Sequence, residues 1–119
     1  MTVKIARISE TEAISLPRES WSKKLLTGET VGAGKCMLGV SRFTPGTVTS
    51  MLTHQEEELA YVLKGKGKIR LRDGEVSYEQ GDGIYISPGT PHSVVNDGDE
   101  DVEMVFAFSW PDYPPTEKG

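Results

Sequence analysis

Glycine and proline interrupt this chain at short intervals, and they constrain its fold more than any other feature. The 119 residues include 13 glycines and 7 prolines. Between them lie short segments rich in β-branched and aromatic residues, often alternating with polar ones, as half-buried strands do. The sequence therefore predicts strands over 3–8, 35–43, 59–63, 67–72, 75–78, 83–86, 93–96 and 102–108. Short strands separated by regular turns indicate an all-β barrel or sandwich.

One segment, 50–60, is open to a second interpretation. It contains three glutamates and other good helix formers, and in a helix His54 and Glu58 would form an i, i+4 pair. We favour strand structure instead, because Gly65 and Gly67 follow closely and strand-like alternation takes over at once.

Charge and composition limit the partners. Thirteen lysines and arginines against eighteen aspartates and glutamates leave a net charge of −5. Such a surface repels phosphate backbones and anionic lipid, so we expect no nucleic acid and no membrane as partner. The basic residues of 64–72 alternate along one strand face, which a solvated surface explains more simply than an anion site. No apolar run is long enough for a spanning helix.

The length suits a single domain, 1–119. We assign a strand-rich barrel core to about 35–109, an N-terminal strand extension to 1–34 and an irregular, proline-rich tail to 110–119. The one cysteine, Cys36, cannot form an internal disulfide, and the N-terminus has no apolar leader. Both features favour a cytoplasmic location. We expect Cys36 to be buried as a small hydrophobic residue.

The most informative stretch is 81–96, which reads G-D-G-I-Y-I-S-P-G-T-P-H-S-V-V-N. A short apolar strand runs into a turn at Pro88 and Gly89, and His92 then opens a second strand. A histidine on a rigid strand start is presented as a metal or substrate site requires. Because the chain has only two histidines, His54 is its candidate partner.

A second stretch, 46–65, reads G-T-V-T-S-M-L-T-H-Q-E-E-E-L-A-Y-V-L-K-G. It resembles the first motif of the cupin family, in which a glycine and five residues precede His-x-His, and a glutamate and a further glycine follow. Leu52 stands at the first histidine position, His54 at the second, and Glu58 at the glutamate position. The replacement of a histidine by Leu52 is the main departure.

The stretch 81–96 is similar to the second cupin motif, which runs glycine, five residues, Pro-x-Gly, two residues, histidine, three residues and asparagine. Gly81, Gly89, His92 and Asn96 all match, and Ser87 replaces the first proline. Together the two motifs and the segment between them cover about half of the chain.

This resemblance implies a small antiparallel β-barrel, the cupin or double-stranded β-helix (jelly-roll) fold. It also implies a divalent metal, iron, manganese, nickel, copper or zinc, held by His54, Glu58 and His92, with Glu58 and His92 as catalytic residues. Leu52 removes one of the usual ligands. Two histidines and one carboxylate can still hold a metal with open positions, as in non-haem iron oxygenases, and zinc accepts three protein ligands and a water.

Other interpretations of these residues remain open. His54 and His92 would, in a metal-free barrel, be lining residues satisfied by hydrogen bonds. Glu58 belongs to a run of three glutamates, and such runs usually lie on a solvated face. Strand alternation puts Glu56 and Glu58 on one face and Glu57 on the other, so Glu56 is a candidate replacement for the missing histidine.

We therefore expect an enzyme acting on a small organic molecule inside the barrel, with a slight preference for oxygen-dependent, dioxygenase-like chemistry over isomerase or lyase chemistry. The alternatives are a metal-free protein that binds or senses a small ligand, and a metal-free catalyst using Glu58 or His92 as general base. A homodimer is common among the proteins that the chain resembles.

Apolar residues should supply the core and the wall of any cavity, and they favour an apolar or aromatic ligand. We expect Tyr61 and Tyr85 to be core or wall residues. The other residues assigned to the core or the wall are Met37, Phe43, Met51, Met104, Phe106 and Phe108.

Overall fold

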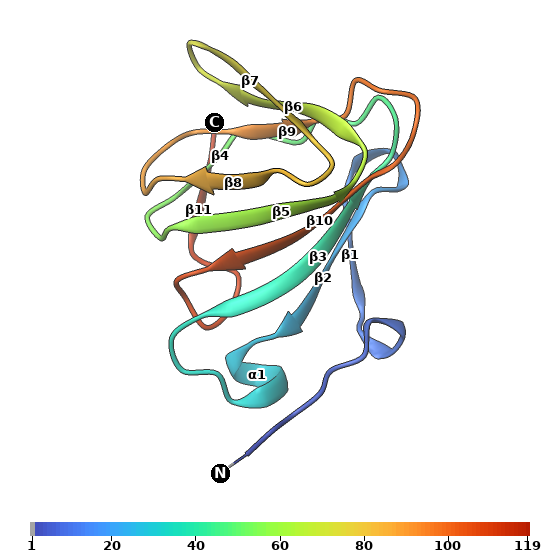
Figure 1. Ribbon diagram of the computed structural model, residues 1–119. Coiled ribbons are helices and arrows are strands. Elements are labelled where there is room, and N and C mark those ends of the chain that lie inside the picture. Colours follow the sequence, from blue (N-terminus) through green and yellow to red (C-terminus); the bar gives the residue numbers. More distant parts are fainter. Residues whose placement is uncertain (1) are drawn as a thin grey trace.

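The computed structural model describes residues 2–119 (Figure 1). Its strands are β1 (Ala13–Ser15), β2 (Trp21–Leu26), β3 (Met37–Phe43), β4 (Leu52–His54), β5 (Glu58–Lys64), β6 (Lys66–Leu71), β7 (Gly74–Glu79), β8 (Gly83–Ile86), β9 (Ser93–Val95), β10 (Val102–Phe108) and β11 (Thr116–Lys118). A short helix, α1 (Gly28–Val31), and two 3-10 turns, Ile8–Glu10 and Pro17–Glu19, complete the elements. Within the described chain, no helix is long and apolar enough to cross a membrane.

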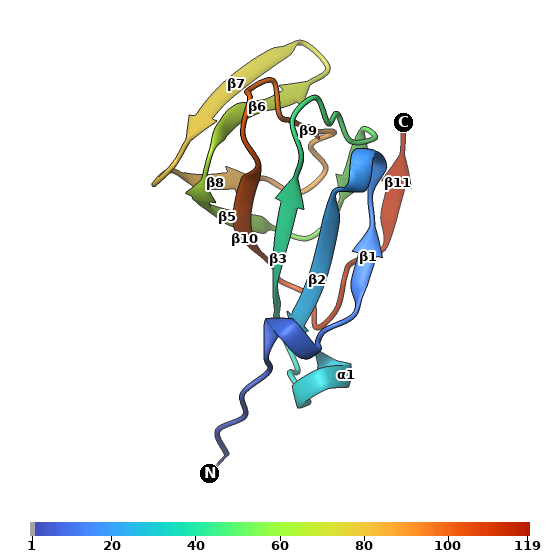
Figure 2. The same cartoon turned by 90° about the vertical axis from the view of Figure 1, so that its right-hand side faces the viewer.

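The strands form an antiparallel barrel. One sheet has the order β1-β2-β3-β10-β5-β8, a second the order β7-β6-β9, and β11 pairs with β4. Isolated bridges, Leu52 to His92 and Val48 to Val95, join the β4 region to the β9 region. Figures 1 and 2 show the smaller sheets closing over one face of the six-stranded sheet. The expected all-β antiparallel barrel is confirmed.

The core lies between the sheets. In β3 and β10 every second residue is buried, as period-2 alternation requires. The predicted core residues Met37, Phe43, Met104, Phe106 and Phe108 are buried, and Met51 is half-buried. Each fully buried apolar side chain contributes roughly 1.5–3 kcal/mol through its removal from water. The apolar side chains of the larger cluster are Phe43, Val62, Ile69, Tyr78, Val102 and Met104.

The backbone conformation explains why two of the motif positions are glycine. Gly65 has φ +86°, and a Cβ there would lie 2.7 Å from the carbonyl oxygen of Asp101. Gly89 has φ +75°, and its amide donates a hydrogen bond of 2.7 Å to the carbonyl of His54. The left-handed backbone at these positions favours glycine. Gly89 therefore ties the turn before His92 to the strand that carries His54.

The N-terminal part differs from expectation. The predicted strand 3–8 is wrong, because residues 3–7 pair with no strand of the described chain, Ile8 begins a 3-10 turn, and Val3 and Ile5 are exposed. Figures 1 and 2 both show this segment running away from the sheets. The strand β2 was not predicted, since W-S-K-K-L-L lacks alternation and all six of its residues are half-buried.

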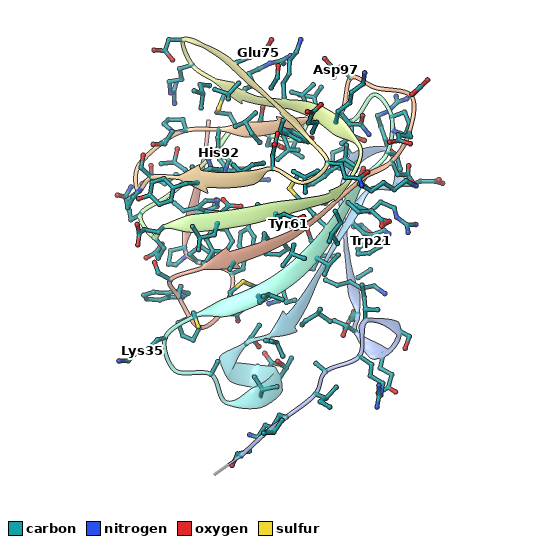
Figure 3. All side chains as sticks on the ribbon, viewed as in Figure 1. Trp21, Lys35, Tyr61, Glu75, His92 and Asp97 are labelled. Atoms are coloured by element: carbon teal, nitrogen blue, oxygen red, sulfur yellow. The ribbon has the colours of Figure 1, made fainter. Side chains whose placement is uncertain are left out.

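Four further expectations are tested by the structure. The tail 110–119 is not wholly irregular, because β11 forms within it. Cys36 is exposed rather than buried. Tyr61 and Tyr85 are 50% and 57% exposed, so they do not belong to the core; Tyr61 is labelled on the larger sheet in Figure 3. The basic residues of β6 form a solvated, ion-paired face, as predicted; Lys68, for example, lies 3.3 Å from Asp97.

Candidate metal centre

Three side chains from separate elements meet inside the barrel. His54 ends β4 and Glu58 begins β5 after a tight bend. His92, labelled in Figure 3, directly precedes β9. His54 and His92 are 3% and 5% exposed, so both rings are removed from bulk water. One ligand atom from each of His54, Glu58 and His92 lies within 4.8 Å of the other two, which makes the three residues a group that could hold a metal ion. The structure thus brings together all three residues predicted from the motifs.

The Glu58 carboxylate lies at the centre of this group. Its Oε1 is 3.3 Å from His92 Nε2 and 3.7 Å from His54 Nε2. The same oxygen is buried and accepts no hydrogen bond from the residues that the structure describes. A buried carboxylate oxygen without a donor is costly unless a positive charge faces it.

The second nitrogen of each ring is held from outside the group. His92 Nδ1 lies 2.9 Å from the Thr90 carbonyl oxygen, and His54 Nδ1 lies 2.8 Å from Thr116 Oγ1. A carbonyl oxygen can only accept, so the neutral His92 ring carries its hydrogen on Nδ1. Its Nε2 therefore faces Glu58 with a free lone pair, as a metal-binding imidazole requires.

The two rings differ in basicity. Burial lowers the pKa of His54 below 6.5, although the Glu58 carboxylate opposes this effect. Burial also acts to lower the pKa of His92, but the nearby Glu58 carboxylate and the Thr90 carbonyl favour the charged ring and outweigh it, so the pKa lies above 6.5. When His92 is charged, its additional proton is on Nε2 and points towards Glu58. A divalent metal would supply positive charge at the same place.

Neighbouring residues of the first motif have other roles. Leu52 is half-buried beside His92, where the resemblance places a ligand. Glu56 has a buried Oε1 without a hydrogen-bond partner among the described residues, and its charge acts to raise the pKa of His54. It is nevertheless not one of the three converging groups, so the idea that it replaces the missing histidine gains no support. Glu57 is exposed and accepts a 2.7 Å hydrogen bond from the Tyr85 hydroxyl.

Aromatic rings surround His54. Its centroid lies 4.9 Å from that of Phe108 and 5.6 Å from that of Tyr113, both in edge-on geometry. Burial and the Glu58 charge raise the pKa of Tyr113 to about 12, so its phenol stays neutral at physiological pH. Sequence reasoning did not identify Tyr113 or Thr116 as site residues, because only tertiary structure brings the tail here.

Two surface hollows lie away from this group. One of about 250 Å³ is lined by the loop regions around Gly65, Glu79 and Asp99. Another of about 660 Å³ lies between the N-terminal segment, β2 and α1. Neither includes His54, Glu58 or His92, so the candidate site rests on its converging side chains.

Comparison with known proteins agrees with this fold. Residues 39–108 match the Cupin_2 family model, described as a cupin domain. The tetracenomycin polyketide synthase protein TcmJ of Streptomyces glaucescens is 28% identical over 89 residues, covering 74% of this chain and 60% of TcmJ. The chain spans 54% and 60% of the lengths of two curated relatives that it matches.

Two solved structures share the fold across nearly the whole chain. The polyketide cyclase RemF from Streptomyces resistomycificus has a TM-score of 0.83 at 23% identity, covering 98% of this chain and 85% of RemF. A predicted oxalate decarboxylase from Thermotoga maritima has a TM-score of 0.74 at 25% identity, covering 90% of this chain and 99% of that one.

Proposed function

The chain belongs to the cupin family, and we propose that it is an enzyme of small-molecule metabolism whose barrel holds a divalent metal on His54, Glu58 and His92. One observation carries this proposal. Glu58 Oε1 is buried, accepts no hydrogen bond from the described residues, and faces the Nε2 atoms of both histidines. Two imidazole nitrogens and a carboxylate oxygen around one point match the donor set of iron, manganese, nickel, copper and zinc.

The protein would provide the binding geometry for this ion. A metal bound there supplies a Lewis acid that polarises an oxygen of the substrate. Glu58 contributes the negative charge, and the carbonyl of Thr90 holds the His92 ring with Nε2 directed inward. Leu52 donates nothing, so it leaves a coordination position for water or substrate. Burial of both rings limits competition by bulk water.

The aromatic surroundings favour an apolar, aromatic or polyketide-like substrate. Phe106, Phe108 and Tyr113 line the region around His54, with adjacent ring centroids 5.3–5.9 Å apart. Such walls suit flat, apolar molecules and leave orientation to a few polar groups. The names of TcmJ and RemF refer to polyketides, which agrees with this substrate class.

A second candidate function is oxygen-dependent chemistry on iron. Two histidines and one carboxylate with open positions form the ligand set of non-haem iron oxygenases. The same three residue types at His54, Glu58 and His92 therefore favour oxygen-dependent chemistry. Similarity to the predicted oxalate decarboxylase from Thermotoga maritima supports decarboxylation of a small diacid such as oxalate as a further reaction to test. Dependence of turnover on dioxygen separates the first of these from a cyclase.

The decisive experiment is elemental analysis of protein purified without an affinity tag or chelator. We expect near-stoichiometric metal in the wild type, loss in His92→Ala, and retention in Glu57→Gln, which changes an exposed neighbour of Glu58. Wild-type protein that stays metal-free after incubation with each of the five ions would overturn the proposal. It would then favour the metal-free alternatives, a ligand-binding barrel or general base catalysis by Glu58 or His92.

The loaded protein should next be tested for turnover. Suitable substrates are a linear poly-β-ketone that can cyclise to an aromatic product, and oxalate, each with and without dioxygen. Product formation lost together with the metal in His92→Ala would assign the activity to this site.

We also propose that the protein is a homodimer and works in the cytoplasm. Support for the dimer comes from apolar side chains on the outer face of the larger sheet, where Leu59, Tyr61 and Tyr85 are each at least half exposed. Half-buried Val105 and Ala107 of β10 lie opposite Tyr61 and Leu59 and extend this face. At its edge Arg42 is already paired with Glu103 at 3.1 Å, so two copies would not meet like charges there.

A further inference from the structure

The C-terminal segment 110–119 returns to the candidate metal centre and is anchored along its length. The Pro111 carbonyl accepts a 2.6 Å hydrogen bond from the Gly28 amide, and Asp112 pairs with Lys24 at 2.8 Å. Beyond these contacts, β11 pairs with β4, with Thr116 directly opposite His54. At the end of the chain, Arg72 donates to the Gly119 carbonyl. The segment is thus built into the wall that carries His54.

The Thr116 hydroxyl has one hydrogen, and the Pro114 carbonyl oxygen is the neighbour that can act only as its acceptor. Thr116 Oγ1 donates it to the Pro114 carbonyl at 2.8 Å, and a carbonyl can only accept. The same Oγ1 lies 2.8 Å from His54 Nδ1. Because its hydrogen is already used, the hydroxyl accepts here, and His54 Nδ1 is the donor. The neutral His54 ring therefore carries its hydrogen on Nδ1 and leaves Nε2 free.

This contact has no substitute among residues 2–119. Thr116 Oγ1 is the only hydrogen-bond partner of the His54 side chain in the described chain. Phe108 and Tyr113 contact the ring edge-on and hold it in place but offer no acceptor to Nδ1. Without the hydroxyl, a hydrogen on Nε2 would be favoured, since it would point at the Glu58 oxygen 3.7 Å away. A hydrogen on Nε2 would occupy the nitrogen lone pair that has to be free for binding a metal ion.

We propose that Thr116 is a positioning residue of the metal centre: its hydroxyl, oriented by the Pro114 carbonyl, sets the tautomer of His54 and so keeps Nε2 open for the ion. The inference rests on the proposed function for its consequence, metal affinity, but the tautomer itself is a property of the metal-free protein. Removal of an outer-shell partner of a histidine ligand typically weakens metal binding 10- to 100-fold.

The test compares Thr116→Val, which keeps the shape and loses the hydroxyl, with Thr116→Ser, which restores the hydroxyl. Thr53→Val is the matched control, because Thr53 lies on β4 beside His54, pairs with Glu117 and has no side-chain hydrogen bond in the described chain. Thr116→Ala provides a second hydroxyl-free variant should valine disturb β11. Circular dichroism and thermal unfolding establish that each variant is folded.

The first readout is the imidazole ¹⁵N spectrum of metal-free protein at about pH 8.5, where neutral rings dominate. With only two histidines, two ring systems need assignment. We expect the Nδ1-H tautomer for His54 in the wild type, Thr116→Ser and Thr53→Val, and a shift towards Nε2-H in Thr116→Val. An unchanged His54 tautomer in both hydroxyl-free variants would overturn the proposal.

The second readout is Zn²⁺ affinity, measured by competition with a chromogenic chelator. We expect Kd to rise about 10- to 100-fold in Thr116→Val and to change by less than about threefold in the serine variant and the control. Equal affinity in wild type and Thr116→Val would refute the effect on the metal. If wild-type protein binds no metal, the proposed function fails, and the tautomer comparison alone decides the role of Thr116.

Discussion

Leu52 lies directly opposite His92 across two antiparallel segments, and their backbones exchange two hydrogen bonds of 2.8 and 2.9 Å. Directly opposed residues of such a pair place their side chains on the same side of the sheet. Leu52 is also two residues from His54 on one strand, which again gives the two side chains a common face. Leu52 thus stands where a third imidazole would complete the ligand set.

Leu52→His should therefore tighten metal binding by adding a fourth protein ligand. We expect a gain of about tenfold or more in Zn²⁺ affinity, equivalent to about 1.4 kcal/mol. Thr53→His is the matched control, since it puts an imidazole on the opposite face of the same strand. Titration against a competing chelator measures the Zn²⁺ affinity of both variants. A loss of stability in Leu52→His with no gain in affinity would mean that Leu52 serves only to pack the interior.

Glu58→Gln should abolish metal binding, because it removes the charged ligand, yet it should stabilise the metal-free protein. The amide can donate a hydrogen to the His92 Nε2 lone pair, 3.3 Å from Oε1, whereas the carboxylate of Glu58 cannot. We expect the free energy of unfolding to rise by about 1 kcal/mol, or a few degrees in Tm, at alkaline pH with chelator present. Glu57→Gln should change neither quantity. A destabilised metal-free Glu58→Gln protein would contradict this assignment of the unpaired oxygen.

Acid should loosen the C-terminal segment through Asp112. The hydrogen bond from Lys24 and the backbone amide of Tyr113 hold the pKa of this carboxyl below its usual 3.8. A depressed pKa stabilises the fold fully above the unfolded value, and that contribution is lost as pH falls through the folded value. The pH range over which the Asp112 carboxylate stops stabilising the fold therefore lies below pH 3.8. The effect is small, because the ion pair is partly exposed to solvent.

Thermal unfolding of wild type and Asp112→Asn, between about pH 5 and about pH 2.5 with chelator, checks this prediction. The difference in stability between the two should be largest at the upper end and vanish at the lower end. Asp99→Asn, which changes an exposed loop carboxyl, serves as control. A difference that stays constant across the range would exclude the Asp112 carboxylate as its origin.

The exposed apolar face predicts self-association. Stable interfaces bury about 800 Å² on each partner, and an apolar sheet face can pack on its symmetry mate at about 10 Å. Sedimentation velocity should give twice the mass of the chain. Tyr61→Lys should reduce the measured mass to that of the monomer. Val76→Lys should leave the mass unchanged, because Val76 is 59% exposed on β7, which belongs to another sheet. A monomeric wild type at micromolar concentration would contradict the proposed dimer.

Much of this protein could be predicted from local sequence patterns. Strands β8 and β10 coincide with their predicted ranges, since alternation and flanking turns specify them. The convergence of His54, Glu58 and His92 was implied by the resemblance of two segments to the cupin motifs. The spacing of the motif glycines has a backbone cause that is visible in the positive φ values of Gly65 and Gly89.

Other elements carried no local signal. Strand β2 lacks alternation, and the predicted strand 3–8 had a suitable pattern but found no partner strand in the described chain. Strands form only when a second segment satisfies their backbone hydrogen bonds, and residue patterns alone do not show which partner is available. Strand β11 is three residues long, follows two prolines, and gains its pairing from β4.

Residue patterns along the chain predicted an all-β barrel, placed His54 and His92 in two motifs, and showed a leucine at position 52 where the first motif has a histidine. Only the folded chain shows that Thr116, 62 residues from His54, contacts its ring and that Tyr113 packs against it. The reason is physical: a tautomer depends on which acceptor lies within hydrogen-bond distance of Nδ1, and that acceptor comes from whichever distant segment the sheet pairing brings alongside.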